Sequence, residues 1–401
     1  MANVSSSNGL EKRPKLRFPG FDDPWKVFKA EELFQNITDR NHPDETVLTI
    51  IQGKGTLPRE QAGRNIHYDD ASLSNYKKVE QGDFIIHLRS FEGGLEMANE
   101  AGIVSPAYTI LRCKRPHSSL FYDAYFHTDE FINHNLSKSV EGIRDGRQIS
   151  YEAFKWLGIP YCEPTEQEKI STLFSAFNER IAKQRDLVES LKKYKRGVVR
   201  TLLSPKHCKL KNVEWTTAKI GNIGTFIKGA PLSKADISSD GTPFILYGEL
   251  YTTYNEVISK VVRKTQASVD KQYYSQIGDV IIPSSGETPE EISTASCVML
   301  PDIILAGDLN IYRCTQVDGR IMSYILNHVV NDRIARVAQG KSIVHVQATE
   351  ISKIEITYPD LISQKKLIET FDAITARIDQ SMRELELLQV RRKALLQQLF
   401  I

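Results

Sequence analysis

Three kinds of catalytic motif can be sought in this 401-residue chain, and each lacks a residue that its chemistry requires. An adenine methyltransferase that flips its base needs a (D/N/S)PP(Y/F) loop, and the chain contains no Pro-Pro dipeptide. The Gly-Lys-Ser stretch at 340–342 resembles the end of a phosphate-binding loop, but Ala335 stands where that loop needs glycine. Asp302 and Asp308 could begin a nuclease carboxylate cluster, yet Asn310 occupies the lysine position. The sequence therefore predicts no catalytic residue and no cofactor bound by this chain.

Four loop-like stretches instead carry residue types that contact nucleic acid. The stretches RIARVAQGKSIVH and VEGIRDGRQIS combine cations, which can meet phosphates, with glycines that let the backbone approach a partner. In RSFEGGLE and SSGETPEE, arginine is suited to guanine, glutamate to cytosine and serine to either. An ordinary solvated turn is the alternative for each stretch, and Lys54 and Lys228 are weaker candidates. The predicted DNA contacts are Arg89, Ser90, Lys138, Arg144, Arg147, Ser284, Ser285, Glu287, Arg333, Arg336, Lys341 and Ser342.

Composition limits the remaining classes of function. The net charge of +2 gives no global field for nucleic acid, so local clusters would have to supply any such binding. No apolar run approaches the roughly 20 residues needed to cross a bilayer, and we expect a cytoplasmic protein. The five cysteines form no C-x-x-C pair and the nine histidines show no ligand spacing, so we expect reduced thiols and no metal site.

One stretch of the sequence occurs twice. Residues 161–204 align with 358–401 without a gap, and Gln167 recurs as Gln364. In both copies apolar residues alternate at spacings of three and four, the pattern of a left-handed coiled coil. Both seams are polar at the same two places, Gln184 and Lys195 in the first copy and Ser381 and Arg392 in the second. The predicted apolar seam consists of Phe174, Phe177, Ile181, Val188, Leu191, Val198, Phe371, Ile374, Ile378, Leu385, Leu388 and Leu395.

A module of strand-like runs and turns precedes each copy. The Gly-Asp-apolar run at 82–86 resembles the run at 278–282, and 108–113 resembles 309–314. We therefore predict an α+β fold with an internal pseudo-twofold repeat. Because a compact module returns its exit close to its entry, the two long helices should run antiparallel. The predicted parts are an N-terminal tail (1–20), module 1 (21–160), a central helix (161–205), module 2 (206–357) and a C-terminal helix (358–401).

Each predicted helix also carries a basic run. Lys192, Lys193, Lys195 and Arg196 lie in the first copy, and Arg391, Arg392 and Lys393 in the second. Such runs usually form a solvated helix face. Because they match between the copies, we predict contact with DNA phosphates or a partner helix.

Several of these stretches resemble one known family. The opening RPKLRFPGFDDPW, the Gly-Asp strands, the loops VAQGKSIVHVQ and VEGIRDGRQIS, the Tyr-Pro-Asp segment before Gln364 and the terminal RRKALLQQLF are similar to the specificity (S) subunit of Type I restriction-modification systems. The resemblance covers nearly the whole chain. It is most specific in the two helices and least specific inside the modules.

The resemblance implies a non-catalytic subunit with two target-recognition domains, each reading half of a split double-stranded DNA sequence. The paired helices would set the spacing and dock two methyltransferase (M) subunits, to which the motor-nuclease (R) subunits join. S-adenosylmethionine, Mg and ATP would then be bound only by those partners. The alternative is a coiled-coil scaffold that assembles protein partners without reading DNA.

Overall fold

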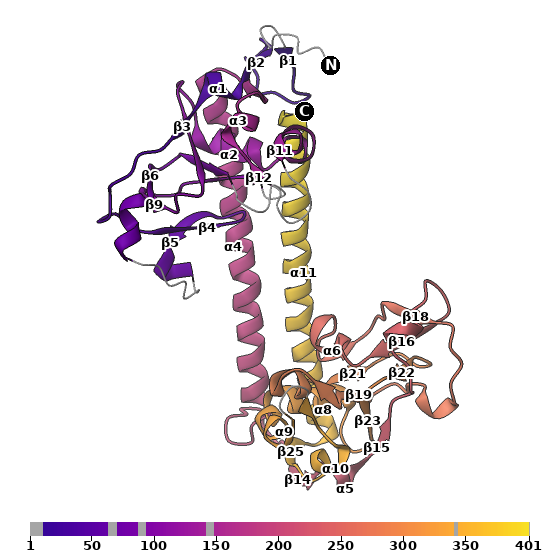
Figure 1. The fold of residues 1–401 in the computed structure, drawn as a ribbon. Helices are drawn as coiled ribbons and strands as arrows, with labels where there is room; N and C mark the ends of the chain where they lie inside the picture. The colour runs from indigo at the N-terminus through magenta and orange to yellow at the C-terminus, as the bar shows by residue number, and fades with distance from the viewer. Residues whose placement is uncertain (1–10, 63–69, 87–93, 142–147, 341–343, 401) are drawn as a thin grey trace. The chain divides into compact units, whose positions relative to one another are not determined.

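The chain forms two compact units. The computed structural model describes residues 11–62, 70–86, 94–141, 148–340 and 344–400 (Figure 1). Unit 1 contains residues 1–185 and 383–401, and unit 2 contains residues 186–382. The two long helices α4 (Pro164–Leu202) and α11 (Leu361–Phe400) therefore each contribute one part to each unit.

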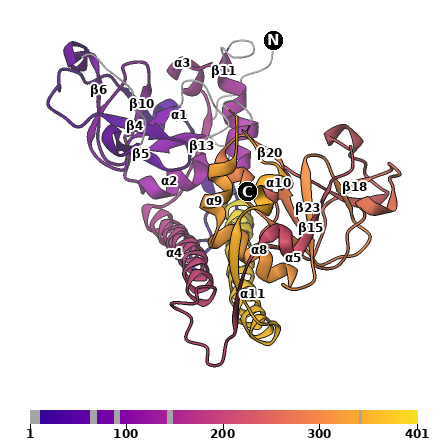
Figure 2. The ribbon, with the colours of Figure 1, turned by 90° about the horizontal axis from the view of Figure 1, so that it is seen from below.

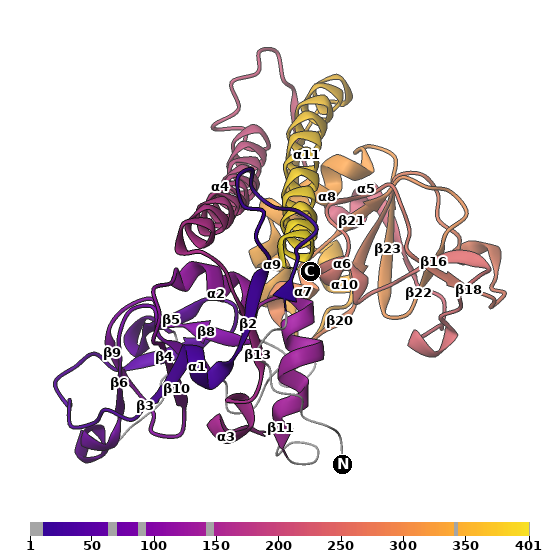
Figure 3. The ribbon, with the colours of Figure 1, turned by 90° about the horizontal axis from the view of Figure 1, so that it is seen from above.

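Unit 1 is built on an antiparallel sheet in the order β3-β10-β7-β8. Phe84, Ile86 and Leu111 pack into an aromatic core with α2, whereas Ile85 and Ile110 pack on the opposite face with β4, β6 and β9. Both faces are thus buried, which explains the uninterrupted apolar run in β7. In Figure 1 and Figure 3, β6 and β9 lie at the edge of the unit away from the last turns of α11. The elements are β1 (Glu11–Lys12), β2 (Trp25–Lys29), α1 (Ala30–Leu33), β3 (Phe34–Ile37), β4 (Leu48–Ile51), β5 (Gly55–Pro58), β6 (Lys77–Val79), β7 (Phe84–Ile86), β8 (Leu95–Met97), β9 (Gly102–Val104), β10 (Thr109–Cys113), α2 (Ser119–Phe126), β11 (Val140–Glu141), β12 (Gln148–Ile149), α3 (Tyr151–Phe154) and β13 (Gly158–Tyr161).

Unit 2 has a five-stranded sheet in the order β15-β23-β19-β21-β17. Val280, Ile282 and Tyr312 pack toward α8, and Ile281 and Ile311 pack on the other face. A smaller sheet, β18-β16-β22, lies away from α8 (Figure 1 and Figure 2). The elements are β14 (Trp215–Lys219), α5 (Ile220–Ile223), β15 (Gly224–Lys228), β16 (Thr242–Leu246), α6 (Glu249–Thr252), β17 (Val257–Ile258), β18 (Arg263–Thr265), β19 (Asp279–Pro283), β20 (Ser285–Gly286), α7 (Pro289–Ile292), β21 (Ser296–Val298), β22 (Ile304–Ala306), β23 (Leu309–Cys314), α8 (Gly319–His328), α9 (Asn331–Val337), β24 (Val344–His345), α10 (Ala348–Ser352) and β25 (Glu355–Pro359).

The same ion pair joins the two central strands of each sheet. Asp83 accepts hydrogen bonds from Nε and Nη2 of Arg112 at 2.8 and 2.7 Å. Asp279 accepts the equivalent pair from Arg313 at 2.9 and 3.1 Å. Two parallel bonds between a guanidinium and a carboxylate fix both side chains in direction as well as distance. The helices and sheets of both units confirm the predicted α+β fold. A common origin of the two halves stays a prediction.

A buried glutamine attaches each long helix to its module. In unit 1, Gln167 donates from Nε2 to the Cys162 carbonyl (2.8 Å) and accepts at Oε1 from the Ser118 amide (3.0 Å). In unit 2, Gln364 donates to the Pro359 carbonyl (2.8 Å) and accepts from the Asp318 amide (2.7 Å). Ser118 and Asp318 are the residues that precede α2 and α8. Each glutamine therefore connects the start of a long helix to the start of the helix that covers the sheet.

The long helices bury the predicted seam. Phe174, Ile181, Val188, Phe371 and Ile378 are at most 8% exposed. The polar seam positions Gln184 and Ser381 are buried as well, at 5% and 1%. The remaining members, which are half-buried, are Phe177, Leu191, Val198, Ile374, Leu385, Leu388 and Leu395.

Toward the end of each helix the most buried position moves by one residue. Val199 and Leu396, rather than Val198 and Leu395, are the buried side chains there. Both pack into module cores, where the straight 3.6-residue period of the helix replaces the 3.5-residue period of the seam. The predicted seam residues Val198 and Leu395 are half-buried beside them and also pack against the module cores.

Within unit 1 the helix segments run antiparallel. Gln184 donates to Glu384 (3.2 Å), and Arg392 donates to the Asn178 side chain (2.7 Å). Residue numbers fall along α11 as they rise along α4, as the sequence predicted. No helix in the described part of the chain combines the length and the apolarity needed to span a bilayer.

The glutamine link is testable by removing its hydrogen bonds at constant size. We expect Gln364→Met to lower the free energy of unfolding by about 2–4 kcal/mol, because the Asp318 amide and the Pro359 carbonyl lose their partner inside the protein. Urea unfolding followed by circular dichroism measures this. The exposed Glu369→Ala on the same helix is the control and should change stability by less than about 0.5 kcal/mol. An unchanged urea midpoint for Gln364→Met would show that the link is not needed.

Candidate nucleic-acid interface

Two of the predicted loops of unit 2 form one surface. The strand β20 follows the Gly-Asp strand and pairs antiparallel with β24, so that Ser285 lies opposite His345 and Gly286 opposite Val344. The Val346 amide extends this pairing by donating to the Ser284 carbonyl at 3.1 Å. The fold thus places the SSGETPEE loop beside the segment that leads to and from residues 341–343.

The serines of this surface do not face solvent. Ser284 and Ser285 are each 6% exposed, and the Ser285 hydroxyl hydrogen-bonds Nδ1 of His345 at 2.9 Å. Both serines are buried, which corrects the expectation that they are presented to base edges. Glu287 is exposed as predicted, and its amide is held by the Glu291 carboxylate at 2.9 Å.

Two of the predicted cations of unit 2 lie on the short helix α9. Arg333 and Arg336 are both exposed. Arg333 donates to the Glu355 carbonyl at 2.9 Å, whereas Arg336 makes no hydrogen bond or ion pair with any described residue. After α9, paired hydrogen bonds between Gln339 and His345 (2.9 and 2.8 Å) close a hairpin. The predicted contacts Lys341 and Ser342 lie outside the described residues.

Unit 1 has a hairpin in the corresponding place. The strands β11 and β12 pair antiparallel, with Val140 opposite Ile149. Lys138 precedes β11 and is exposed. The candidates Arg89, Ser90, Arg144 and Arg147 lie outside the described residues.

Three polar residues of the unit 2 hairpin were not among the predicted contacts. Gln339, His345 and Gln347 are exposed on the same strand pair, whereas Val344 and Val346 are buried. The alternation in Val-His-Val-Gln is the period-two pattern of a half-buried strand and could have indicated them.

Residues 212–389 match the Type I restriction modification DNA specificity domain. This match covers most of module 2 and most of α11, so this part of the chain is similar to a DNA specificity domain of Type I restriction-modification systems. The fold of the chain is similar to that of the Type-I restriction-modification system S subunit from M. genitalium, with a TM-score of 0.56 at 15% identity, covering 97% of this chain and 99% of that one. It is also similar to a chain solved for the complex assembly and conformational transition of the type I R-M system, with a TM-score of 0.60 at 15% identity, covering 96% and 99%. No curated protein sequence matches the chain.

One lysine of the basic runs, Lys195, is buried and is therefore not available to DNA. Lys195 is 7% exposed, pairs with Glu256 at 2.9 Å and lies 5.2 Å from the centre of the Tyr324 ring. His328, at the end of α8, contacts the same carboxylate at 2.8 Å. Lys195 therefore anchors module 2 to α4, which corrects its predicted role in contacting phosphate or a partner helix.

The two cationic neighbours control the ionisation of Glu256. Burial alone would raise the pKa of this carboxyl, but the hydrogen bond from His328 and the charge of Lys195 outweigh burial and lower the pKa to about 2. A carboxyl with a depressed pKa in the folded state stabilises the fold above its unfolded pKa. That stabilisation is lost as the pH falls from about 4.5 toward 2.

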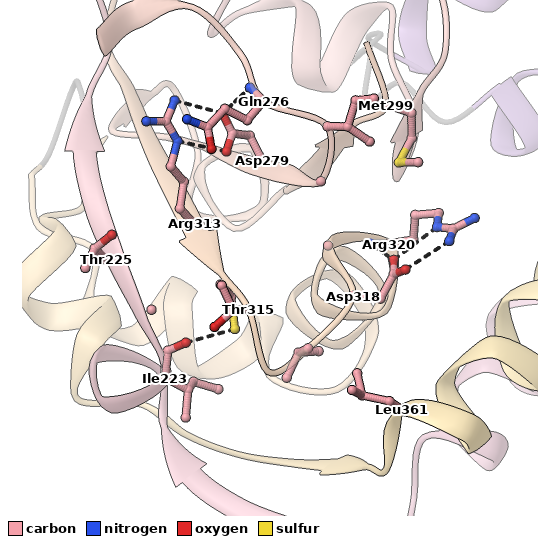
Figure 4. A pocket seen from close by; sticks show the side chains of 16 residues that line it. Ile223, Thr225, Gln276, Asp279, Met299, Arg313, Thr315, Asp318, Arg320 and Leu361 are labelled. Atoms are coloured by element: carbon pink, nitrogen blue, oxygen red, sulfur yellow. Dashed lines mark hydrogen bonds and ion pairs between the residues drawn. The ribbon is translucent and has the colours of Figure 1, made fainter. Parts of the chain in front are cut away.

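A cavity of about 700 Å³ in unit 2 is lined by charges that are already paired (Figure 4). Arg313 is held by Asp279, and Arg320 donates to Asp318 at 2.9 Å. Among the described residues, no three His, Cys, Asp or Glu side chains are placed to hold a metal ion. All five cysteines are free. This cavity therefore offers no uncompensated charge for a ligand.

The Lys195–Glu256–His328 cluster predicts a specific pH dependence. We expect Glu256→Gln to lower the free energy of unfolding by about 3 kcal/mol at pH 7, since it leaves Lys195 buried without its partner. The difference from the unchanged protein should shrink as the pH falls from about 4.5 toward 2, where Glu256 itself becomes protonated. Urea unfolding at several pH values measures this difference. A difference that stays constant down to pH 2.5 would contradict the assignment.

Proposed function

We propose that this chain is a specificity subunit of a Type I restriction-modification system and reads a bipartite double-stranded DNA sequence, with one half read by the module of each unit. The observation that carries the proposal is the hairpin that follows the sheet-covering helix in each unit. In both units this hairpin belongs to the stretch that carries the predicted contacts. Loops held by a rigid sheet are the usual place for binding residues, because their sequence can change without disturbing a core.

The residue types on the unit 2 hairpin divide into two roles. Arg336 is a cation without a protein partner among the described residues and is suited to a backbone phosphate, which positions the protein on DNA. Glu287, Gln339 and His345 are exposed and can exchange hydrogen bonds with base edges, which supply sequence information. Lys138 is the exposed cation beside the unit 1 hairpin.

The long helices are the proposed docking site for two methyltransferase subunits. In unit 2, Leu187 and Tyr194 of α4 are 39% and 61% exposed, and in unit 1, Leu387 and Val390 of α11 are 47% and 59% exposed. Exposed apolar side chains of this size favour a protein partner. The motor-nuclease subunits would join through the methyltransferases. Catalysis, with S-adenosylmethionine, Mg and ATP, would belong to these partners in the cytoplasm, and this chain would not be an enzyme.

The role of Arg336 tests the proposal directly. We expect Arg336→Ala to weaken binding of the full chain to its methylated target, because one phosphate contact is lost. The slope of log affinity against log salt should fall by about 1. A gel-shift series across salt concentrations measures both quantities.

The control for this experiment is Lys353→Ala. Lys353 is an exposed cation of the same unit that pairs with Glu350 on α10 at 2.6 Å, and its removal should leave the salt slope unchanged. DNA binding by the unchanged chain that shows no salt dependence would argue against DNA reading and for the scaffold alternative.

A further inference from the structure

The tip of the β4–β5 hairpin in unit 1 is held rigidly from behind. The buried Glu96 carboxylate accepts hydrogen bonds from the amides of Gly53 (2.7 Å) and Gly55 (2.9 Å). Asn99 donates from Nδ2 to the Lys54 carbonyl at 2.7 Å. Gly55 has φ of +75°, and an added Cβ would lie 2.5 Å from the Met97 carbonyl oxygen, so no other residue fits there. The backbone of Lys54 is thus fixed between two glycines.

The side chain of Lys54 makes no hydrogen bond or ion pair with any residue that the structure describes. It is exposed, and no described carboxylate lies within ion-pair distance of its ammonium group. A buried acid and a side-chain amide therefore hold the backbone of a lysine whose charge remains free. Such positioning costs little when a ligand binds, because the backbone around the charge is already ordered.

Two arginines of the long helices face the same place. Arg185 of α4 is exposed and has no ion pair with a described residue. Arg392 of α11 is half-buried, donates from Nε to the neutral Asn178 side chain at 2.7 Å and lies 5.9 Å from the centre of the Phe174 ring. No described carboxylate is within ion-pair distance of Arg392, and burial lowers the pKa of its guanidinium. Its charge is therefore partly desolvated and not neutralised.

These three cations line one cavity of about 580 Å³ within unit 1. The other titratable groups that line it are Glu96, Asp123 and His127. His127 lies 3.6 Å from Glu96 and 3.5 Å from Asp123, so the two acids share a cation of their own. The cavity keeps an excess of positive charge, because none of Lys54, Arg185 and Arg392 forms an ion pair with a carboxylate among the residues that the structure describes.

The matching position in unit 2 shows what a neutralised site looks like. Lys195 occupies the place in the first repeat copy that Arg392 occupies in the second. Lys195 is paired directly with Glu256 at 2.9 Å. In unit 2 the seam cation, Lys195, is therefore neutralised by a carboxylate of the module. In unit 1 the equivalent cation, Arg392, lies beside an open cavity. An anion from outside the chain would restore the missing pair.

We propose that this cavity, between the Gly53-Lys54-Gly55 tip and the two arginines, binds a phosphate group of the DNA backbone. The inference rests on the proposed function and adds a contact site outside the recognition hairpins. Arginine binds phosphate oxygens through paired N–H groups, and lysine adds a mobile point charge. The cavity is large enough for a sugar-phosphate unit but not for a duplex, so the phosphate enters while the bases stay outside. This contact positions the DNA without reading its sequence.

The test compares Lys54→Ala and Arg185→Ala in the full chain with the control Lys183→Ala. Lys183 is an exposed cation of the same helix that pairs with Glu179 and does not line the cavity. Fluorescence anisotropy with the methylated target should show about a three- to tenfold loss of affinity for each cavity variant at 0.1 M salt. The slope of log affinity against log salt should fall by about 1. Arg185→Lys should retain most of the affinity, and Lys183→Ala should match the unchanged protein.

Other outcomes identify what would be wrong. Cavity variants that bind DNA as tightly as the control, while the unchanged chain binds well, overturn the phosphate site and leave the proposed function standing. Calorimetry could show that the unchanged chain binds inorganic phosphate and that only the cavity variants lose this binding. If the DNA affinity of these variants is unchanged, the cavity binds a free anion instead. Loss of methyltransferase binding without loss of DNA affinity assigns it to an acidic protein surface. Absence of DNA binding by the unchanged chain overturns the proposed function and the inference together.

Discussion

The structure of each unit depends on one buried amide side chain at the start of a long helix. Gln167 and Gln364 each satisfy a carbonyl of the incoming strand segment and the amide that precedes the sheet-covering helix. Both glutamines are at most 1% exposed, so neither backbone group could turn to water if the amide were lost. Within each unit the glutamine therefore fixes the start of the long helix relative to the helix that covers the sheet. In unit 1, Glu166 strengthens this junction by accepting from Trp25 (2.9 Å) and from Arg17 (2.7 Å).

This junction gives each unit a rigid frame that can hold the proposed recognition hairpins in place. The Asp–Arg pairs fix the central strands, and both sheet faces are buried, so the sheets leave little room for change. The hairpins that follow α2 and α8 use backbone pairing, which many side chains can accommodate. Exposed side chains such as Arg336 and His345 can therefore set DNA contacts without altering the core. The same frame places unpaired cations beside the unit 1 cavity.

The sequence predicted the long helices well because their signal is local and repeated. Ile181 and Ile378, taken from a spacing of three and four, are both buried seam residues. The Gly-Asp runs also predicted the central strands, since a short apolar run between turns has few alternatives. The shift from Val198 to Val199 was missed because it depends on packing against a module core, which no single helix pattern contains.

The candidate contacts could be predicted only in part. The cations of α9 are exposed because a short surface helix leaves most of its side chains in solvent, and residue type alone was enough to find them. The prediction for Ser284 and Ser285 was wrong because strand pairing between distant segments decides which side chains are buried. The prediction for Lys195 was wrong for a similar reason, since its partner Glu256 lies 61 residues away in the sequence. Residue types indicate what a group can do, whereas tertiary pairing decides whether it is free to do it.

The central claim is that each module reads its own half of one DNA sequence. The most direct measurement replaces residues 206–355 with the second module of a Type I specificity subunit, expresses the chimera with the methyltransferase proposed to bind this chain and sequences the methylated motif. Lys195 and Gln364 lie outside the exchanged segment, but their partners Glu256 and Asp318 lie inside it. The donor module must therefore supply equivalent partners. The account predicts that one half of the methylated motif changes to that of the donor and the other half stays the same. A methylated motif in which both halves change, or in which neither half changes, would contradict this account.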